Sequence, residues 1–188
     1  MAYSRGVSER FANRPANDAW TELGERQYDL QWSRFRQKFG FRPGTDPASW
    51  PAIAEPEPSV TFDLSIISDG ARRGAAYDAI NAEALRAFLW SLAGVPELVA
   101  LDWQHPGYLF RPAVQALGWQ PEWKIPVYPD GDYFAFMTPD FTDGTFGHPW
   151  EQTLCVFGAR LLDSLGRSLA TWLPTKRRNQ VSTDLGRP

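Results

Sequence analysis

Two histidines are the side chains of this sequence best suited to acid–base chemistry or to metal binding. His105 and His148 are each followed directly by a proline. Because proline restricts the preceding residue to extended backbone, neither histidine is expected inside a helix. Each also has a carboxylate three positions away, Asp102 before His105 and Glu151 after His148. Such a carboxylate orients an imidazole for general base catalysis or fixes it as a metal ligand.

These pairs define one candidate catalytic set. His148 is the expected base, Glu151 or Asp102 its orienting partner, and His105 a second acid–base group. Two imidazoles and one or two carboxylates that converged could also hold a divalent metal. The spacing lacks the specificity of HExxH or paired CxxC, so the sequence predicts no metal and no cofactor. The structural alternative is that a histidine packs beside tryptophan and bonds a backbone carbonyl.

A second candidate site is an aromatic and acidic surface in a predicted sheet. Polar residues alternate with apolar ones in segments 59–65 and 98–103, which places Asp63 on one face with Asp102 and Gln104. Tyr133 and its neighbours put aromatic side chains on both faces of another strand. The residues expected to bind a ligand are Asp63, Gln104, Asp132, Tyr133 and Trp150. Solvation of the carboxylates and packing of the aromatic rings under the proline-rich segment 43–58 are the structural alternatives.

Other reactive motifs are weak. Cys155, the only cysteine of the chain, lies in an apolar segment without a glycine-rich turn or helix N-terminus to lower its pKa, so a buried free thiol is expected. Segment 144–147 has two glycines but neither the lysine nor the helix of a phosphate-binding loop. It is expected to form a turn.

Hydrophobic periodicity predicts the elements that position these residues. Helical spacing runs from Asp18 to Phe39. A second helix is expected to start at an Asn81 cap and to end at Gly94, and a third carries Leu161, Leu165 and Leu169. Alternation predicts the following strands: 59–65, 98–103, 108–110, 124–128, 133–137 and 151–157. An Asp-Gly turn at 129–132 indicates a hairpin between 124–128 and 133–137.

This order of elements favours an α+β fold. Alternating strands joined by hairpins are typical of an antiparallel sheet, and the helices predict a two-layer sandwich with helices on one face and an open second face. Length and composition (188 residues, 43% hydrophobic) fit a single domain. We expect that domain at residues 18–173, between disordered basic tails at 1–17 and 174–188.

Charge and hydropathy restrict the partners. Residues 18–170 carry −8, because the chain is −3 overall and its two ends, 1–17 and 171–188, carry +2 and +3. Such an acidic body repels phosphate backbones, so nucleic acid is not an expected partner. No membrane-spanning stretch and no secretory signal are recognised, so a cytoplasmic protein is expected.

Four segments together resemble a bacterial family, common in actinomycetes, known as domain of unknown function 2716. They are PSVTFDL (58–64), LDWQH (101–105), PDGDY (129–133) and GTFGHPWEQTLCVFG (144–158). The likeness runs from about residue 28 to 174. It implies a bacterial, stand-alone, cytoplasmic protein, and it implies no activity, cofactor or catalytic residue.

Two functions remain open. The first is a binding domain whose aromatic and acidic face holds a small molecule, a peptide or a partner protein, with masking of a basic toxin by an immunity protein as one instance. The second is a small acid–base enzyme, of hydrolase or tailoring type, that uses His148 with Glu151 and His105 with Asp102. An enzyme of that kind needs both histidines in one pocket, whereas a binding domain needs only a continuous patch.

Overall fold

An antiparallel sheet of eight strands runs through the middle of the molecule, in the order β1-β4-β3-β5-β6-β7-β2-β8. The computed structural model describes residues 19–67, 70–118 and 122–180. The expected tail at 1–17 lies outside the described residues. The strands are β1 (Trp20–Glu22), β2 (Ser59–Asp63), β3 (Leu98–Asp102), β4 (Tyr108–Phe110), β5 (Phe134–Met137), β6 (Gly144–His148), β7 (Thr153–Phe157) and β8 (Thr175–Asn179).

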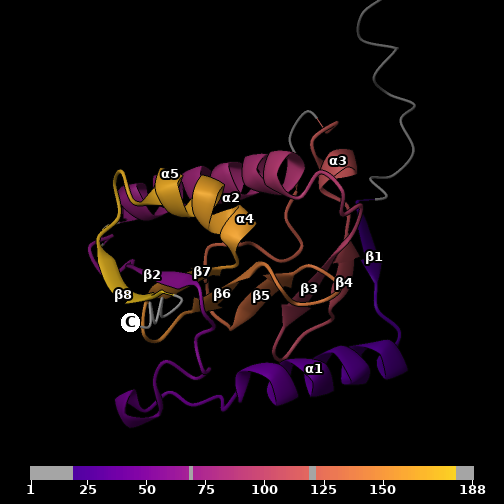
Figure 1. Ribbon diagram of the computed structural model, residues 1–188, viewed down its shortest axis with the longest axis horizontal. Coiled ribbons are helices and arrows are strands. Elements are labelled where there is room, and N and C mark those ends of the chain that lie inside the picture. The colour runs from indigo at the N-terminus through magenta and orange to yellow at the C-terminus, as the bar shows by residue number, and fades with distance from the viewer. Residues whose placement is uncertain (1–18, 68–69, 119–121, 181–188) are drawn as a thin grey trace, which may run out of the picture.

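Helices cover both faces of this sheet (Figure 1). The long α1 lies on one face, and α2 lies on the other together with the continuous helical stretch of α4, η2 and α5. The helices are α1 (Glu25–Phe39), η1 (Pro47–Ser49), α2 (Gly70–Ser91), α3 (Pro112–Gln115), α4 (Ala159–Leu161), η2 (Leu162–Gly166) and α5 (Arg167–Leu169). None in the described ranges is long and apolar enough to cross a membrane.

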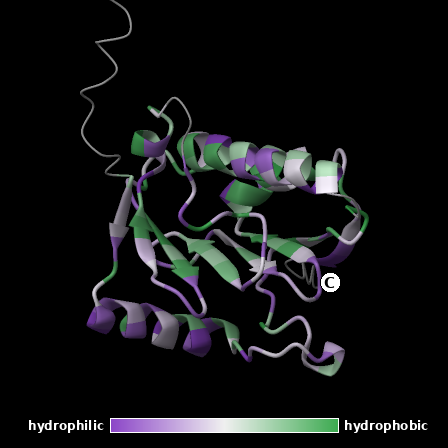
Figure 2. Cartoon of the chain, turned by 180° about the vertical axis from the view of Figure 1, so that it is seen from behind, coloured by the Kyte–Doolittle hydropathy of each residue, from purple (hydrophilic) through white to green (hydrophobic). Residues whose placement is uncertain are grey.

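The hydrophobic core has two parts, one on each face of the sheet. On the α2 face, Val60 and Phe62 of β2 pack with Leu154 of β7 and with the leucines of the last helical stretch. On the α1 face, Trp32, Phe35 and Phe39 pack against Cys155 and other sheet residues. Successive strand residues thus alternate between two buried faces, and the central strands β3 and β5 are almost entirely hydrophobic (Figure 2).

The α+β class and the antiparallel sheet are confirmed. The second face differs from the expectation, because α1 and the chain just beyond it cover it. The periodicity of residues 25–39 predicted an apolar helix stripe, but this pattern does not say which face of a sheet the stripe covers. Residues 20–22 are a strand rather than part of that helix, and they pair with β4.

The predicted hairpin is wrong. Residues 124–128 form no strand, and β5 pairs instead with β3 and β6. Pro126 has no N–H for a ladder, and the N–H groups of Val127 and Tyr128 donate to Oδ1 of Asn81. Asn81 is therefore buried inside α2, where it holds segment 127–128, and it is not a helix cap.

Two further segments were expected as loop or tail and are strands. Segment 144–148 is β6, where a Cβ on Gly144 would lie 2.2 Å from the carbonyl oxygen of Phe136, so only glycine fits. Residues 175–179, within the expected tail, pair with β2 as the edge strand β8. Residues 181–188 lie outside the described residues.

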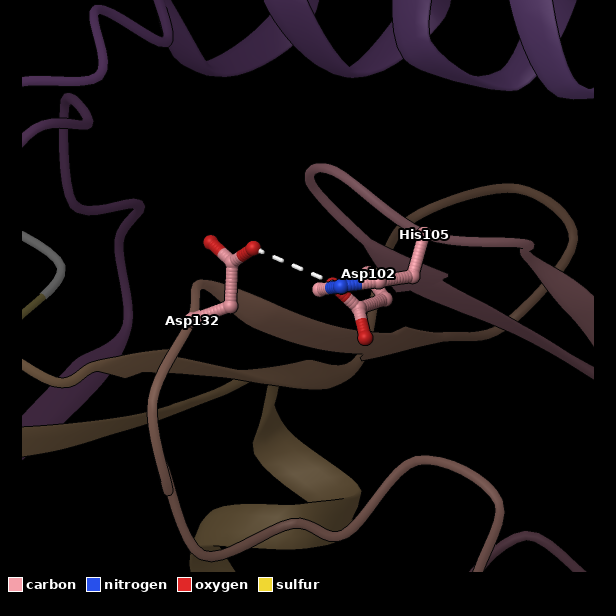
Figure 3. Close-up of side chains that lie close together, drawn as sticks. All are labelled: Asp102, His105 and Asp132. Atoms are coloured by element: carbon pink, nitrogen blue, oxygen red, sulfur yellow. Dashed lines mark hydrogen bonds and ion pairs between the residues drawn. The ribbon is translucent and has the colours of Figure 1, made fainter.

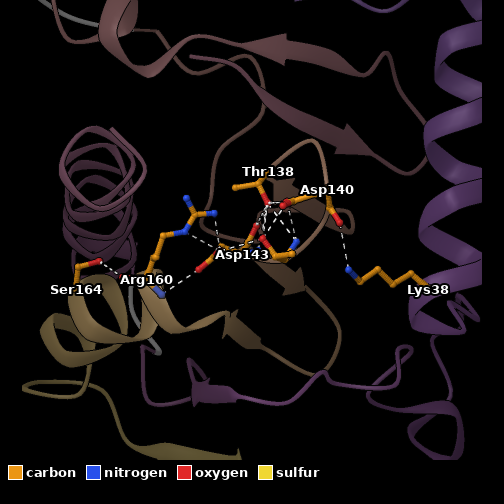
Figure 4. Close-up of polar contacts among 7 residues, drawn as sticks. Lys38, Thr138, Asp140, Asp143, Arg160 and Ser164 are labelled. Atoms are coloured by element: carbon orange, nitrogen blue, oxygen red, sulfur yellow. Dashed lines mark hydrogen bonds and ion pairs between the residues drawn. The ribbon is translucent and has the colours of Figure 1, made fainter. Parts of the chain in front are cut away.

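The turn between β5 and β6 ties the two helical layers to the sheet (Figure 4). Lys38 of α1 donates to the carbonyl of Asp140 over 3.2 Å. On the other side, Arg160 of α4 binds the carboxylate of Asp143 at 2.8 Å. Hydrogen bonds from Thr138 and Thr142 lower the pKa of Asp140 to about 2, so that carboxylate stays ionised and holds the turn.

Candidate functional site

The loop after β3 places His105 against two aspartates (Figure 3). Nδ1 of His105 lies 2.9 Å from Oδ1 of Asp102 and 3.7 Å from Oδ2 of Asp132. One ligand-capable atom from each of the three side chains lies within 4.8 Å of the others. The His105 side chain is 63% exposed, whereas those of Asp102 and Asp132 are 11% and 9% exposed. The cluster is therefore a solvent-facing imidazole above two largely buried carboxylates.

The register of β3 and β5 explains why these residues meet. Asp102 is the last residue of β3 and lies opposite Phe134, the first residue of β5. Because the strands are antiparallel, the chain beyond Asp102 runs alongside the residues that precede Phe134, which include Asp132. His105 reaches this aspartate from the loop that leads to β4.

The hydrogen bond between His105 and Asp102 changes the pKa of both groups. The hydrogen bond with Asp102 raises the pKa of His105. Burial raises the pKa of Asp102, and the hydrogen bond with His105 opposes this rise. An exposed imidazole held by a carboxylate can exchange a proton with a bound molecule, which is the chemistry expected of this pair from the sequence.

His148 lies in a different environment. It ends β6 and is 1% exposed, with the rings of Trp50, Tyr133 and Trp150 around it. The backbone N–H of Glu151 donates to its Nδ1 over 3.0 Å. Nδ1 is therefore an acceptor, and the proton of the neutral ring sits on Nε2, which lies 3.5 Å from the Tyr133 hydroxyl. Burial lowers the pKa of His148 to about 4.

The Glu151 carboxylate does not orient this histidine. It accepts hydrogen bonds from both terminal nitrogens of Arg177 and from the Thr153 hydroxyl. Arg177 also binds Glu55, with its Nη2 2.7 Å from Oε1. Glu151 thus reaches His148 through its backbone, and its charge is neutralised from β8.

The structure separates the two histidines. His105 contacts Asp102 and Asp132, whereas His148 contacts Glu151 and Tyr133. Tyr133 directly follows Asp132, and its backbone N–H donates to that aspartate over 2.7 Å. The Tyr133 ring packs in the core on the α1 face of the sheet. The two histidine clusters are therefore neighbours in sequence through segment 132–133 but have separate contacts.

The expected ligand-binding residues do not share one face. Phe62 packs on the α2 side of the sheet, so the next residue, Asp63, points to the α1 side. Asp102 alternates in step with Leu98 and Ala100, which pack on the α2 side, so it points to that side. Both alternating sets of β3 are apolar, so the sequence could not tell them apart. Asp63 caps its own turn by accepting from the Ser65 N–H. Gln104 is exposed in the loop beside His105.

Tyr133 and Trp150 do come together, with ring centroids 4.9 Å apart. Trp150 is 36% exposed and borders a cavity of about 210 Å³ beside segment 128–131. The lining residues are Leu64, Arg73, Tyr128, Pro129, Asp130, Gly131, Pro149, Trp150 and Gln152. The loop 128–133 therefore borders this cavity at one end and supplies Asp132 to the His105 cluster at the other.

Sequence reasoning missed three contributors to these sites. Arg73 lines the cavity from α2, Arg177 neutralises Glu151, and Tyr28 donates to the carbonyls of Asp102 and Trp103 at 3.1 Å each. Each comes from an element distant in sequence, and no local pattern marks it. A correct pairing of β8 with β2 is the signal that would have identified Arg177.

Comparison with known proteins gives a consistent assignment. Residues 22–162 match the family described as protein of unknown function (DUF2716). The chain is similar to the uncharacterized protein YxiI of Bacillus subtilis (strain 168), with 34% identity over 153 residues that cover 78% of this chain and 91% of the relative. No solved structure matches the chain. By the family match and this relative, the chain belongs to the DUF2716 family.

Proposed function

We propose that this chain is a protein-binding domain that receives a side chain of a partner protein in the cavity beside loop 128–131. The observation that carries the proposal is the size and lining of that cavity. Its volume of about 210 Å³ is below the roughly 300–1,000 Å³ of pockets that enclose a drug-sized ligand. A single amino-acid side chain fits such a space.

The lining has the residue types that dominate protein–protein binding energy. Trp150 and Tyr128 supply aromatic surface, and Arg73 also lines the cavity. Tryptophan, tyrosine and arginine are the residues most enriched at binding hot spots. The Tyr133 ring contacts the partly exposed Trp150 indole, with centroids 4.9 Å apart, and this contact restricts the orientation of the indole.

Charge indicates the chemistry of the partner. Asp130 lines the cavity, and residues 18–170 carry −8. A basic partner is attracted to such a body, and its association is slowed by salt. The masking of a basic toxin by an immunity protein is one function of this kind.

The enzymatic alternative is supported only by the His105–Asp102 pair, which has the geometry of an oriented imidazole. The His148 half of the expected catalytic set lacks it, because its Nδ1 accepts from a backbone N–H and Glu151 is bound to Arg177. Because the two histidines have different contacts, binding is favoured over catalysis by both together.

Site-specific crosslinking tests the proposal. Benzoylphenylalanine in place of Asp130 should give one discrete protein adduct after irradiation in the producing bacterium. In that background, Trp150→Ala should reduce the adduct at least tenfold. Trp172→Ala should leave it unchanged, since Trp172, 40% exposed, lines another hollow.

A crosslinker in place of Ala79, which lines that other hollow, controls for surface proximity. An adduct of equal yield from Ala79, an adduct insensitive to Trp150→Ala, or no adduct at all contradicts the proposal. A small extra mass in native mass spectrometry that disappears in Trp150→Ala would indicate a small-molecule ligand instead.

A further inference from the structure

We propose that Asp102, His105 and Asp132 form a binding site for one divalent transition-metal ion, of the zinc or manganese type. This site is separate from the proposed partner cavity and does not depend on it. It combines side chains from the end of β3, from the β3–β4 loop and from the segment before β5 (Figure 3).

The distances suit a metal centre. With metal–ligand bonds of about 2.1 Å, neighbouring ligand atoms lie roughly 3.0 Å apart in octahedral and 3.4 Å apart in tetrahedral geometry. Nδ1 of His105 lies 2.9 Å from Asp102 and 3.7 Å from Asp132. All three donor atoms lie within 4.8 Å of one another, so small side-chain movements would complete the coordination.

The charge of the cluster is a second, independent observation. Four acidic residues are buried among the described residues: Asp102, Asp132, Asp143 and Glu151. Asp143 is bound by Arg160 and Glu151 by Arg177. The ion pairs recorded for Asp102 and Asp132 in the described chain are those with His105 alone. Asp102 and Asp132 thus share one weakly basic imidazole, whereas Asp143 and Glu151 are bound by guanidinium groups, and a divalent cation would supply the missing charge.

The surroundings hold the donor atoms in place. The Tyr133 N–H donates to Oδ1 of Asp132, which leaves Oδ2 facing His105. The Tyr28 hydroxyl fixes the backbone at the end of β3 through the carbonyls of Asp102 and Trp103. Outer hydrogen bonds of this kind orient the ligands of metal sites.

The donor set indicates the class of metal. One imidazole nitrogen and two carboxylate oxygens suit zinc, manganese or iron(II), whereas calcium prefers ligand sets made of oxygen alone. Three protein ligands leave at least one coordination position for water or another ligand. Because the His105 side chain is exposed, an ion can enter from solvent.

Calorimetric titration tests the proposal directly. The full chain without a polyhistidine tag, freed of metal with a chelator, is titrated with ZnCl₂. We expect one equivalent to bind with a dissociation constant in the micromolar range or below. Titration with CoCl₂ should give a visible d–d absorption band that saturates at the same stoichiometry.

Single variants assign the site. His105→Ala, Asp102→Asn and Asp132→Asn should each weaken binding at least tenfold. Asp130→Asn is the matched control, since Asp130 is exposed in the same loop and should bind as wild type. Trp150→Ala should also bind normally, which separates this proposal from that of the partner cavity.

Two results would overturn the metal site. One is the absence of saturable binding by the wild-type chain to either ion. The other is binding that survives all three ligand variants, because the ion then sits elsewhere. Circular dichroism of each variant guards against misfolding, and His105→Ala carries the decisive weight because its exposed side chain contributes little to packing.

Discussion

The backbone N–H of Glu151 donates a hydrogen bond to Nδ1 of His148 over 3.0 Å. This contact decides the tautomer of a buried imidazole, because a nitrogen that accepts a hydrogen bond carries no proton. It also closes the turn between β6 and β7. The same histidine contacts the Tyr133 ring, with centroids 4.7 Å apart. His148 therefore stabilises the strand ends on which the exposed Trp150 depends.

Removal of this side chain should be costly. His148→Ala leaves a cavity among aromatic rings and an unsatisfied Glu151 N–H, so we expect the free energy of unfolding to fall by about 2–4 kcal/mol. Gln104→Ala should change it by less than about 0.5 kcal/mol, because that side chain is exposed in its loop. Urea denaturation of the two variants measures the difference. Equal values for both variants would contradict the structural role of His148.

His148 should also make stability depend on pH. Burial lowers its pKa in the folded chain to about 4 from an ordinary value of 6.5, although Glu151 partly raises it. Between these two pKa values the unfolded chain binds more protons than the folded chain. The free energy of unfolding therefore increases as the pH rises and decreases as the pH falls. Over this pH range the titration of His148 changes the free energy of unfolding by up to about 3 kcal/mol.

The matched variant for this pH effect is His148→Asn, whose side-chain oxygen can accept the same N–H but does not titrate. The difference in unfolding free energy between wild type and variant should shrink as the pH is lowered from 6.5 to 4. Urea titrations at several pH values measure it. A difference that stays constant over this range would show that His148 is not buried as a neutral ring.

Arg177 should be a strong stabilising residue of the sheet edge. Its guanidinium bridges Glu55 and Glu151, whose side chains are 6% and 4% exposed. Arg177→Ala leaves the buried Glu55 carboxylate without its cation and Glu151 with only Lys176, whose Nζ lies 3.8 Å from Oε1, and we expect a loss of about 3 kcal/mol. Arg178→Ala removes an exposed cation of the same strand and should cost less than about 0.5 kcal/mol. Thermal or urea unfolding that does not distinguish the two variants contradicts this assignment.

Cys155 provides a chemical measure of opening. It is the only cysteine of the chain, and burial raises its pKa to about 12. Since the thiolate is the reactive form, a thiol reagent such as dithionitrobenzoate should label the folded protein only as fast as the sheet opens. Labelling in concentrated guanidinium chloride should be immediate. Rapid labelling of the native chain would mean that the α1 face is more accessible than the structure indicates.

Local patterns predicted those parts of the fold that depend on nearby residues. The strands β2, β3 and β7 and the buried stripe of Leu161, Leu165 and Leu169 lie where they were expected, although both faces of these strands are buried. Strand β6 was missed because its glycines serve close packing and not a turn: a Cβ on Gly147 would meet Pro129 at 2.8 Å. The predicted hairpin does not form, because Asn81, far away in sequence, binds segment 127–128.

In the candidate site too, local spacing predicted some contacts, and contacts between distant segments were not predicted. The spacing of three residues between Asp102 and His105 predicted their hydrogen bond, which depends on one loop. The contribution of Asp132 depends on the pairing of β3 with β5, two strands separated by more than thirty residues. Likewise, His148 and Glu151 are as close as their spacing suggests, but Arg177 comes from a distant strand and takes the carboxylate. Non-local pairing is what the pattern of one sequence does not encode.

The edge strand β8 has a consequence for how copies of the molecule meet. An outermost strand presents backbone N–H and C=O groups that can template cross-β aggregation. Here that strand reads TKRRN, and its hydrophilic ribbon is evident near the C-terminus in Figure 2. Lys176 and Arg178 are exposed, so two such edges repel each other before their backbones can join. The basic run near the C-terminus thus protects the chain against self-association as fibrils.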